Sequence, residues 1–209
     1  TAPAATDSIA TFSLIEGEGT NKVIPTLTEE QTKAITYTLD QIKEITPDVG
    51  FLILDLDTGA GICYNIDQDI YAASSFKGPY SVYVCESATS GNLPSSTRDN
   101  IHNAIAWSDN NSYYRLRNAY NGSTFTSWME DVGVDPAKAA RTFPTYNVRD
   151  LAKLWLHSYP YLTNTNDSKA QWLANELRNT EVSFLRDGIV LSGASDATVM
   201  NLSLIHISE

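Results

Sequence analysis

Two short segments bring together side chains that could carry out nucleophilic catalysis. Ser74 and Lys77 are three residues apart, so one helical turn would place a hydroxyl and an amine on the same face. Ser108 and Asn110 follow further along the chain and add a second hydroxyl and an amide. A serine hydroxyl is a weak nucleophile until a base takes its proton, and a lysine whose pKa is lowered by burial can be that base. The four residues therefore predict acyl transfer through a serine ester.

Each of these residues has an expected role in that chemistry. We expect Ser74 to be the nucleophile, with its backbone N–H at a helix start helping to stabilise an oxyanion. Lys77 would be the general base, directly or through water. Ser108 would pass the proton to the leaving nitrogen, and Asn110 would hold an amide of the substrate. Trp107, beside Ser108, is a candidate for the substrate cleft, and its alternative is a place in the hydrophobic core.

The surrounding pattern predicts a sheet with a packed helix, followed by a helical block. Residues 28–31 form a capping box, which indicates a helix start. Residues 50–56 and 61–65 predict two strands joined by a turn, and the first is apolar enough to be buried on both faces. From residue 74 to residue 179 the apolar spacing is mostly helical, and Pro79 indicates a distorted first turn in the helix that carries Ser74.

Composition excludes several classes of function. With 42% hydrophobic and 19% charged residues the chain is typical of a globular protein, and its net charge of −11 argues against nucleic acid and anionic lipid as partners. No apolar run is long enough to span a membrane. Cys63 and Cys85 are not part of a Cys-Xaa-Xaa-Cys motif, and either a disulfide or two buried thiols would fit them. We expect a monomer with no metal and no organic cofactor.

The order of the motifs resembles the class A β-lactamase and penicillin-binding protein superfamily of serine hydrolases. In that family Ser-Xaa-Xaa-Lys and Ser-Asp-Asn are followed by Lys-Thr-Gly. Residues 71–79, Tyr-Ala-Ala-Ser-Ser-Phe-Lys-Gly-Pro, resemble its nucleophile segment, and residues 149–155 resemble the helix after its omega loop. The resemblance covers residues 28–201. It implies an α/β (α+β) fold of the β-lactamase/transpeptidase type, with helices packed on an antiparallel sheet and an inserted all-helical domain.

The resemblance also implies a place, a partner and a division of the chain. The protein would be secreted or held in the cell envelope, and it would bind a β-lactam or a cell-wall peptide. Residues 1–22, which lack apolar periodicity, predict a mobile leader. The catalytic domain would cover residues 23–201, with its α/β part in 23–70 and 182–201 and its mainly helical part in 71–181.

Two departures from the family pattern keep alternatives open. Class A β-lactamases use an omega-loop glutamate to activate the deacylating water, whereas residues 136–147 contain neither Glu nor Asp. A D-alanyl-D-alanine carboxypeptidase or penicillin-binding protein is therefore one alternative, and a catalytically inactive cell-wall-binding homologue is another. The Lys-Thr-Gly motif is also absent. Residues 197–201 resemble the start of its strand, but residues 202–209 resemble the translation of a transposon-end adapter used in sequencing libraries.

This tail leads to a prediction about the gene. We interpret residues 202–209 as non-native, so the C-terminal strands would be missing and the fragment inactive. Sequencing the source locus past the codon for Asn201 should then reveal an in-frame Lys-Thr-Gly or a close variant. If the natural frame instead ends with residues 202–209, the product lacks part of the expected active site, and the catalytic prediction fails for this chain.

Overall fold

The chain divides into two compact units, and each is built from a different kind of element. In the computed structural model the described residues are 12–17, 23–181, 187–188 and 191. The sheet unit comprises Thr1–Ile70 with Tyr146–Arg149, and the helical unit comprises Tyr71–Thr145 with Asp150–Glu209. This mixed α/β fold with an antiparallel sheet confirms the predicted fold class. The strand region predicted in residues 182–201 and the tail predicted in 202–209 lie outside the described residues, apart from 187–188 and 191.

The sheet unit contains three antiparallel strands. They are β1 (Ser13–Ile15), β2 (Phe51–Leu54) and β3 (Gly61–Tyr64), and their order in the sheet is β1-β3-β2. Leu52 of β2 and Ser13 of β1 both pair with Cys63, so β3 is the central strand. Ser13–Ile15 belong to the stretch predicted as a mobile leader. They form a strand because they pair with the edge of β3 that β2 does not occupy. Local apolar periodicity does not indicate such a pairing.

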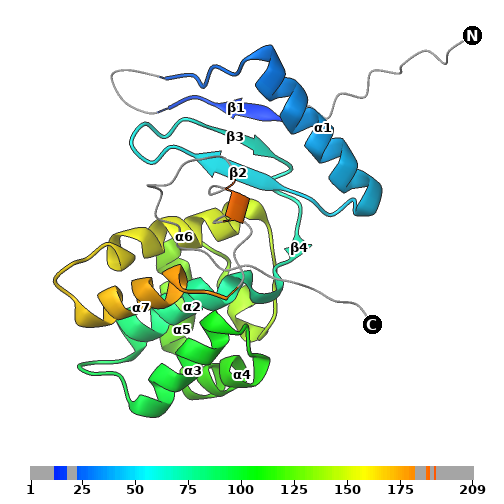
Figure 1. Ribbon diagram of the computed structural model, residues 1–209. Helices are drawn as coiled ribbons and strands as arrows, with labels where there is room; N and C mark the ends of the chain where they lie inside the picture. Colours follow the sequence, from blue (N-terminus) through cyan, green and yellow to red (C-terminus); the bar gives the residue numbers. More distant parts are fainter. Residues whose placement is uncertain (1–11, 18–22, 182–186, 189–190, 192–209) are drawn as a thin grey trace, which may run out of the picture. The chain divides into compact units, whose positions relative to one another are not determined.

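Helix α1 (Glu29–Ile45) lies beside this sheet (Figure 1). Its start confirms the predicted capping box, because the Thr28 side chain accepts from the Gln31 backbone and the Gln31 side chain accepts from the Thr28 backbone. The helix ends where Thr46 adopts an extended conformation, with φ of −148° and ψ of 134°. This conformation is the one favoured for a residue that precedes a proline, here Pro47.

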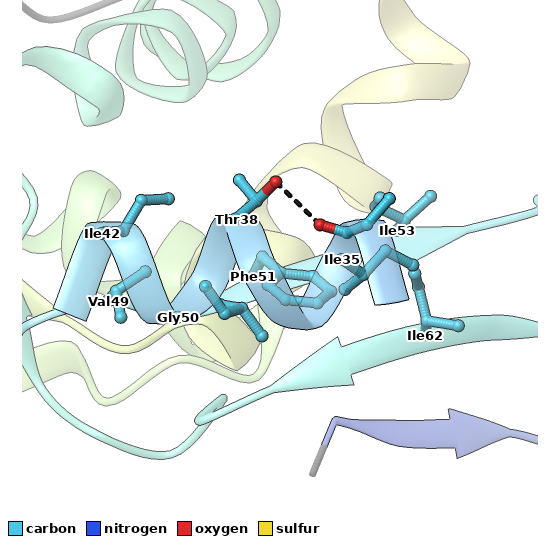
Figure 2. Close-up of a pocket in the computed structure, with 10 residues that line it drawn as sticks. Ile35, Thr38, Ile42, Val49, Gly50, Phe51, Ile53 and Ile62 are labelled. Atoms are coloured by element: carbon cyan, nitrogen blue, oxygen red, sulfur yellow. Dashed lines mark hydrogen bonds between the residues drawn. The ribbon is translucent and has the colours of Figure 1, made fainter. Parts of the chain in front are cut away.

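The burial of β2 differs from the prediction. Residues 50–56 were expected to form a strand buried on both faces, but β2 is shorter and Ile53 is 63% exposed. Residues of α1, β2 and β3 line an apolar groove of about 480 Å³. Figure 2 shows the side chains that line it. The groove is lined by Ile42 of α1 and by Phe51 and Ile53 of β2. Among the described residues, none covers the Ile53 side chain fully.

The remaining elements are one small sheet and a series of helices. Two short strands, β4 (Ile70–Tyr71) and β5 (Thr145–Tyr146), pair in a separate two-stranded sheet. The helices are η1 (Ala73–Phe76), α2 (Lys77–Tyr83), η2 (Val84–Ala88), α3 (Ser95–Ala106), α4 (Asn110–Ala119), α5 (Ser123–Val132), η3 (Pro136–Ala140), α6 (Val148–Leu162) and α7 (Ser168–Arg178). The helix predicted from residue 74 is thus a 3₁₀ turn, an α-helix and a π-helical turn in succession. Pro79 fits in the first turn of α2, where a backbone N–H has no helical partner.

Helix α2 forms the centre of the helical unit, and every one of its residues is buried. Tyr80 packs edge-on against Phe125 of α5 and Tyr113 of α4, at ring-centroid distances of 5.1 and 5.4 Å. The buried Arg117 guanidinium lies 5.0 Å from the Tyr80 ring centroid and 4.8 Å from that of Phe125. Aromatic rings of the core therefore stabilise the buried Arg117 cation.

Cys63 and Cys85 are both free, buried thiols, which settles the choice left open by the sequence. Burial raises the pKa of the Cys85 thiol to about 12. The thiol is therefore protonated and unreactive at neutral pH. Within the described ranges, no helix is long and apolar enough to cross a lipid bilayer.

A close contact between α2 and α6 yields a prediction about stability. A Cβ atom on Gly78 would lie 2.6 Å from Cη2 and 2.9 Å from Cζ2 of the Trp155 indole. Replacing a helical glycine with alanine usually stabilises the folded protein by about 1 kcal/mol, because alanine favours the helix. Overpacking a buried contact destabilises it by about 1–3 kcal/mol. We expect Gly78→Ala to lower the free energy of unfolding measured in urea. The same substitution made in a Trp155→Leu background should cost less, because the clash is then removed. A Gly78→Ala variant as stable as the parent would contradict this packing.

Candidate active site

Helix η1 and the first turn of α2 position the predicted nucleophile and base. Ser74 is the second residue of η1, and Lys77 begins α2. Side chains three residues apart lie on the same side of a 3₁₀ turn, so the two project together. Ala73, just before Ser74, has a φ of 48°, in the left-handed region that a non-glycine residue adopts only at a cost. Ser74 is 4% exposed and Lys77 is fully buried.

A chain of hydrogen bonds joins Ser74 to Lys77 through Ser108. The Ser108 hydroxyl donates to Ser74 Oγ at 2.7 Å, and Lys77 Nζ donates to Ser108 Oγ at 3.2 Å. Lys77 Nζ also donates to the Ser108 carbonyl at 2.6 Å and to Asn110 Oδ1 at 2.8 Å. Four of the five predicted site residues are therefore brought together.

The described contacts between Lys77 and Ser74 run through a hydroxyl. Lys77 was expected to act as base directly or through water, and these contacts add a path through Ser108. Among the hydrogen bonds of the described residues, its ammonium contacts Ser108 and Asn110, and it is connected to Ser74 only through the Ser108 hydroxyl. This follows from the position of Ser108, which places both its carbonyl and its hydroxyl oxygen next to Lys77 Nζ.

Ser108 adopts an unusual backbone conformation to make these contacts. It lies in the short connection between α3 and α4 and has a φ of 55°. The neighbouring Asp109 N–H donates to the Asn103 carbonyl at 3.1 Å, which holds the connection against the end of α3. A left-handed non-glycine residue costs about 1–3 kcal/mol, and such residues cluster at functional sites. Ala73 and Ser108, one beside Ser74 and one bonded to it, both have this feature.

Burial of Lys77 favours its neutral form more than usual. Burial lowers the pKa of the Lys77 ammonium to about 8, and the negative charge of Asp109 opposes this effect. Asp109 caps α4, where its carboxylate accepts from the backbone N–H groups of Asn111 and Ser112 at 3.3 and 2.7 Å. Hydrogen bonds from the Ser112 side chain and backbone hold the pKa of Asp109 below its usual value. A lysine poised near neutral pH has the property that a general base needs.

Trp107 is not gathered with the other four residues. Its side chain is 63% exposed, so the alternative of a core position is wrong. Sequence reasoning also missed Tyr113, whose ring lies 5.7 Å from Lys77 Nζ. The spacing gives a signal for it, because Tyr113 follows Asn110 by three residues and so shares its face of α4.

The carboxylates that flank residues 136–147 are engaged in contacts that support the fold. Asp135 caps η3 by accepting from the Ala137 backbone N–H at 2.9 Å. Asp150 accepts from Lys138 Nζ at 2.5 Å, and both side chains are mostly buried. Across the described residues, no three His, Cys, Asp or Glu side chains form a group that could hold a metal ion. The apolar groove of Figure 2 lies in the sheet unit, whereas Ser74, Lys77, Ser108 and Asn110 all belong to the helical unit.

One family model matches a part of the chain that contains two of the site residues. Residues 29–98 match the sequence model of the β-lactamase enzyme family. The matched segment runs from the start of α1 into α3, so it contains Ser74 and Lys77 and ends before Ser108. No curated protein matched the chain. The family match supports a β-lactamase/transpeptidase-like serine hydrolase superfamily, and a serine-hydrolase type of function on β-lactams.

Proposed function

We propose that the protein is a class A-like serine hydrolase that opens β-lactams through an acyl-enzyme at Ser74, with Lys77 as the general base. The observation that carries this proposal is the hydrogen-bonded path from Ser74 Oγ through Ser108 Oγ to Lys77 Nζ. A nucleophile, a proton relay and a base of lowered pKa thus lie in one sequence of contacts.

The path accounts for each proton in acylation. The neutral Lys77 amine takes a proton from Ser108 as Ser108 takes one from Ser74, and Ser74 Oγ bonds to the lactam carbonyl carbon. The electron pair of that carbonyl moves to its oxygen, which the Ser74 backbone N–H helps to stabilise. When the carbonyl re-forms, the carbon–nitrogen bond of the ring breaks. The proton then returns from Lys77 through Ser108 to the departing nitrogen.

Asn110 and Trp107 are suited to hold the substrate. Because Asn110 Oδ1 accepts from Lys77, its NH₂ group can donate to a carbonyl oxygen of the substrate side chain. Trp107, one residue before Ser108, presents an exposed apolar surface to a bound ligand. We propose that the protein acts as a monomer outside the cytoplasm, where its proposed substrates, β-lactams and cell-wall peptides, are found.

A second candidate function keeps the acylation but changes the substrate. Residues 136–147 offer no carboxylate to activate water, and the flanking Asp135 and Asp150 are held by Ala137 and Lys138. An acyl-enzyme that hydrolyses slowly is the behaviour of a penicillin-binding protein. The alternative is therefore a D-alanyl-D-alanine carboxypeptidase that penicillin inhibits, and the inactive cell-wall-binding homologue remains the non-catalytic option.

The nucleophile is tested by intact-mass spectrometry of the full-length protein, with the sequence of the source locus restored after Asn201, following incubation with benzylpenicillin. We expect an adduct of the whole penicillin mass that peptide mapping places on Ser74, since ring opening loses no atoms. Ser74→Ala should abolish it. Ser75→Ala is the matched control and should retain it, because the Ser75 hydroxyl donates to the Ala72 carbonyl at 2.6 Å instead of joining the path to Lys77.

The fate of this adduct separates the candidate functions. Rapid loss with opened lactam as product indicates a β-lactamase. A long-lived adduct, together with release of D-alanine from a peptide ending in D-Ala-D-Ala, indicates the carboxypeptidase. Absence of any adduct on Ser74 together with an unopened lactam would falsify the acyl-enzyme proposal and leave the binding function.

The pH dependence of acylation tests the role of Lys77. Below the pKa of about 8 the group is protonated and cannot accept a proton, so the acylation rate constant should rise with pH and level off above this value. Lys77→Arg places a permanently charged group there and should slow acylation by about 10²–10⁴-fold. Stopped-flow measurement with a chromogenic cephalosporin provides both readings. A flat profile in the parent protein would show that Lys77 is not the base.

A further inference from the structure

Tyr113 is a buried residue that faces the proposed base. It lies on α4, and its ring centroid is 5.7 Å from Lys77 Nζ, within the range of a cation–π interaction. The ammonium group has three protons, and Ser108 and Asn110 provide three oxygen acceptors for them. The electron-rich face of the ring adds a further favourable contact for the charged form in a site that excludes water.

The Tyr113 side chain is fixed by contacts with two other segments and with its own helix. It packs edge-on against Tyr80 of α2 and at a tilt against Phe143, each at a centroid distance of 5.4 Å. Its hydroxyl donates to the Thr142 carbonyl at 3.1 Å and accepts from the guanidinium of Arg117, on the same helix, at 3.4 Å. Burial raises the pKa of Tyr113 to about 12, so this hydroxyl keeps its proton at neutral pH. One side chain thus connects Lys77 with the segment that follows η3.

We propose that Tyr113 is a positioning residue: its ring stabilises the ammonium form of Lys77 beside Ser108 and Asn110, and its hydroxyl fixes the backbone of residues 141–143. The importance of this contact for catalysis rests on the proposed function, in which Lys77 is the base. The contact itself is a property of the resting protein and can be measured without substrate.

Several groups face the Lys77 ammonium, and they act in different directions. Ser74 of η1 reaches it through Ser108, and Ser108 and Asp109 come from the connection between α3 and α4. Asn110 and Tyr113 come from α4. The Asp109 carboxylate and the Tyr113 ring both favour the ammonium, whereas burial favours the neutral amine. Removing the ring should therefore lower the pKa of Lys77.

The experiment is an NMR titration of the full chain with isotope-labelled lysine, in which Lys77→Arg identifies the Lys77 resonance. We expect Tyr113→Leu to lower the pKa of Lys77 by about 0.5–1.5 units, the range that a desolvated cation–π contact supplies. Tyr113→Phe keeps the ring and should leave the pKa within about 0.3 units of the parent. Tyr114→Leu is the matched control on the same helix: its ring also packs on Phe143, and it too should leave the pKa unchanged.

A second set of variants keeps the test valid if Tyr113→Leu fails to fold. Phenylalanine, trifluorophenylalanine and pentafluorophenylalanine at position 113 have nearly the same shape, but fluorination removes charge from the ring face. The pKa of Lys77 should fall stepwise along this series. An unchanged pKa along the series, or equal shifts for Tyr113→Phe and Tyr113→Leu, would overturn the proposed role of the ring.

The role of the hydroxyl has its own measurement. Tyr113→Phe removes the hydrogen bond to the Thr142 carbonyl, so backbone amide exchange in residues 141–143 should become faster while the Lys77 titration stays the same. Unchanged exchange there would contradict the second half of the proposal.

Failure of this inference can be told apart from failure of the proposed function. If penicillin acylates Ser74 but the pKa of Lys77 does not change when the Tyr113 ring is altered, the proposed function holds and the proposed role of Tyr113 is wrong. If the titration responds to the ring but no adduct forms, the contact is real and the catalytic function is wrong. If both hold, the rising limb of the acylation profile should move to lower pH in Tyr113→Leu by the same amount as the NMR titration.

Discussion

The buried ammonium of Lys77 is the constraint around which the helical unit is arranged. A charged group out of contact with water is costly unless every donor has a partner. Ser108 provides two acceptors and Asn110 a third, all from the short connection between α3 and α4 and the first residue of α4. Ser108 adopts a left-handed conformation, which is energetically unfavourable for a non-glycine residue. In this conformation its carbonyl and its hydroxyl oxygen both accept from Lys77 Nζ.

The aromatic core gives this charged site a rigid base. Tyr80, directly after the first turn of α2, contacts Tyr113 and the buried Arg117, and Arg117 Nη2 donates to the Ala139 carbonyl at 2.5 Å. Together with Phe125 of α5, which packs on Tyr80, these residues connect α2, α4, α5 and η3. Two cations lie close to this core, and aromatic faces contact both of them. Packing and electrostatics in the site are thus set by the same side chains.

Local patterns allowed part of this structure to be predicted from the sequence. The capping box at Thr28 predicted the start of α1, because such a signal lies within a single turn. The motif residues Ser74, Lys77, Ser108 and Asn110 were found because their types and order are specific.

The features that could not be predicted depend on residues far apart in the chain. Strand β1 exists because β3 pairs with it, and the exposure of Ile53 depends on how closely α1 approaches the sheet. The path through Ser108 requires a left-handed turn that no spacing rule indicates. Trp107 is exposed and is the C-cap of α3, beyond the last residue whose direction helical periodicity can predict.

The sheet unit is interrupted in sequence by Tyr71–Thr145, and this affects how the protein can be made on the ribosome. Arg149 bonds Asp67 at 2.7 Å and donates its backbone N–H to the Ile66 carbonyl, a closure across 82 residues. At translation rates of about 5–20 residues per second, residues 66–67 must wait roughly 4–16 s for this partner to be synthesised. Meanwhile, β1 and β2 are the unpaired edges of the described sheet, so a nascent chain would be open to chaperones or to strand exchange during that interval.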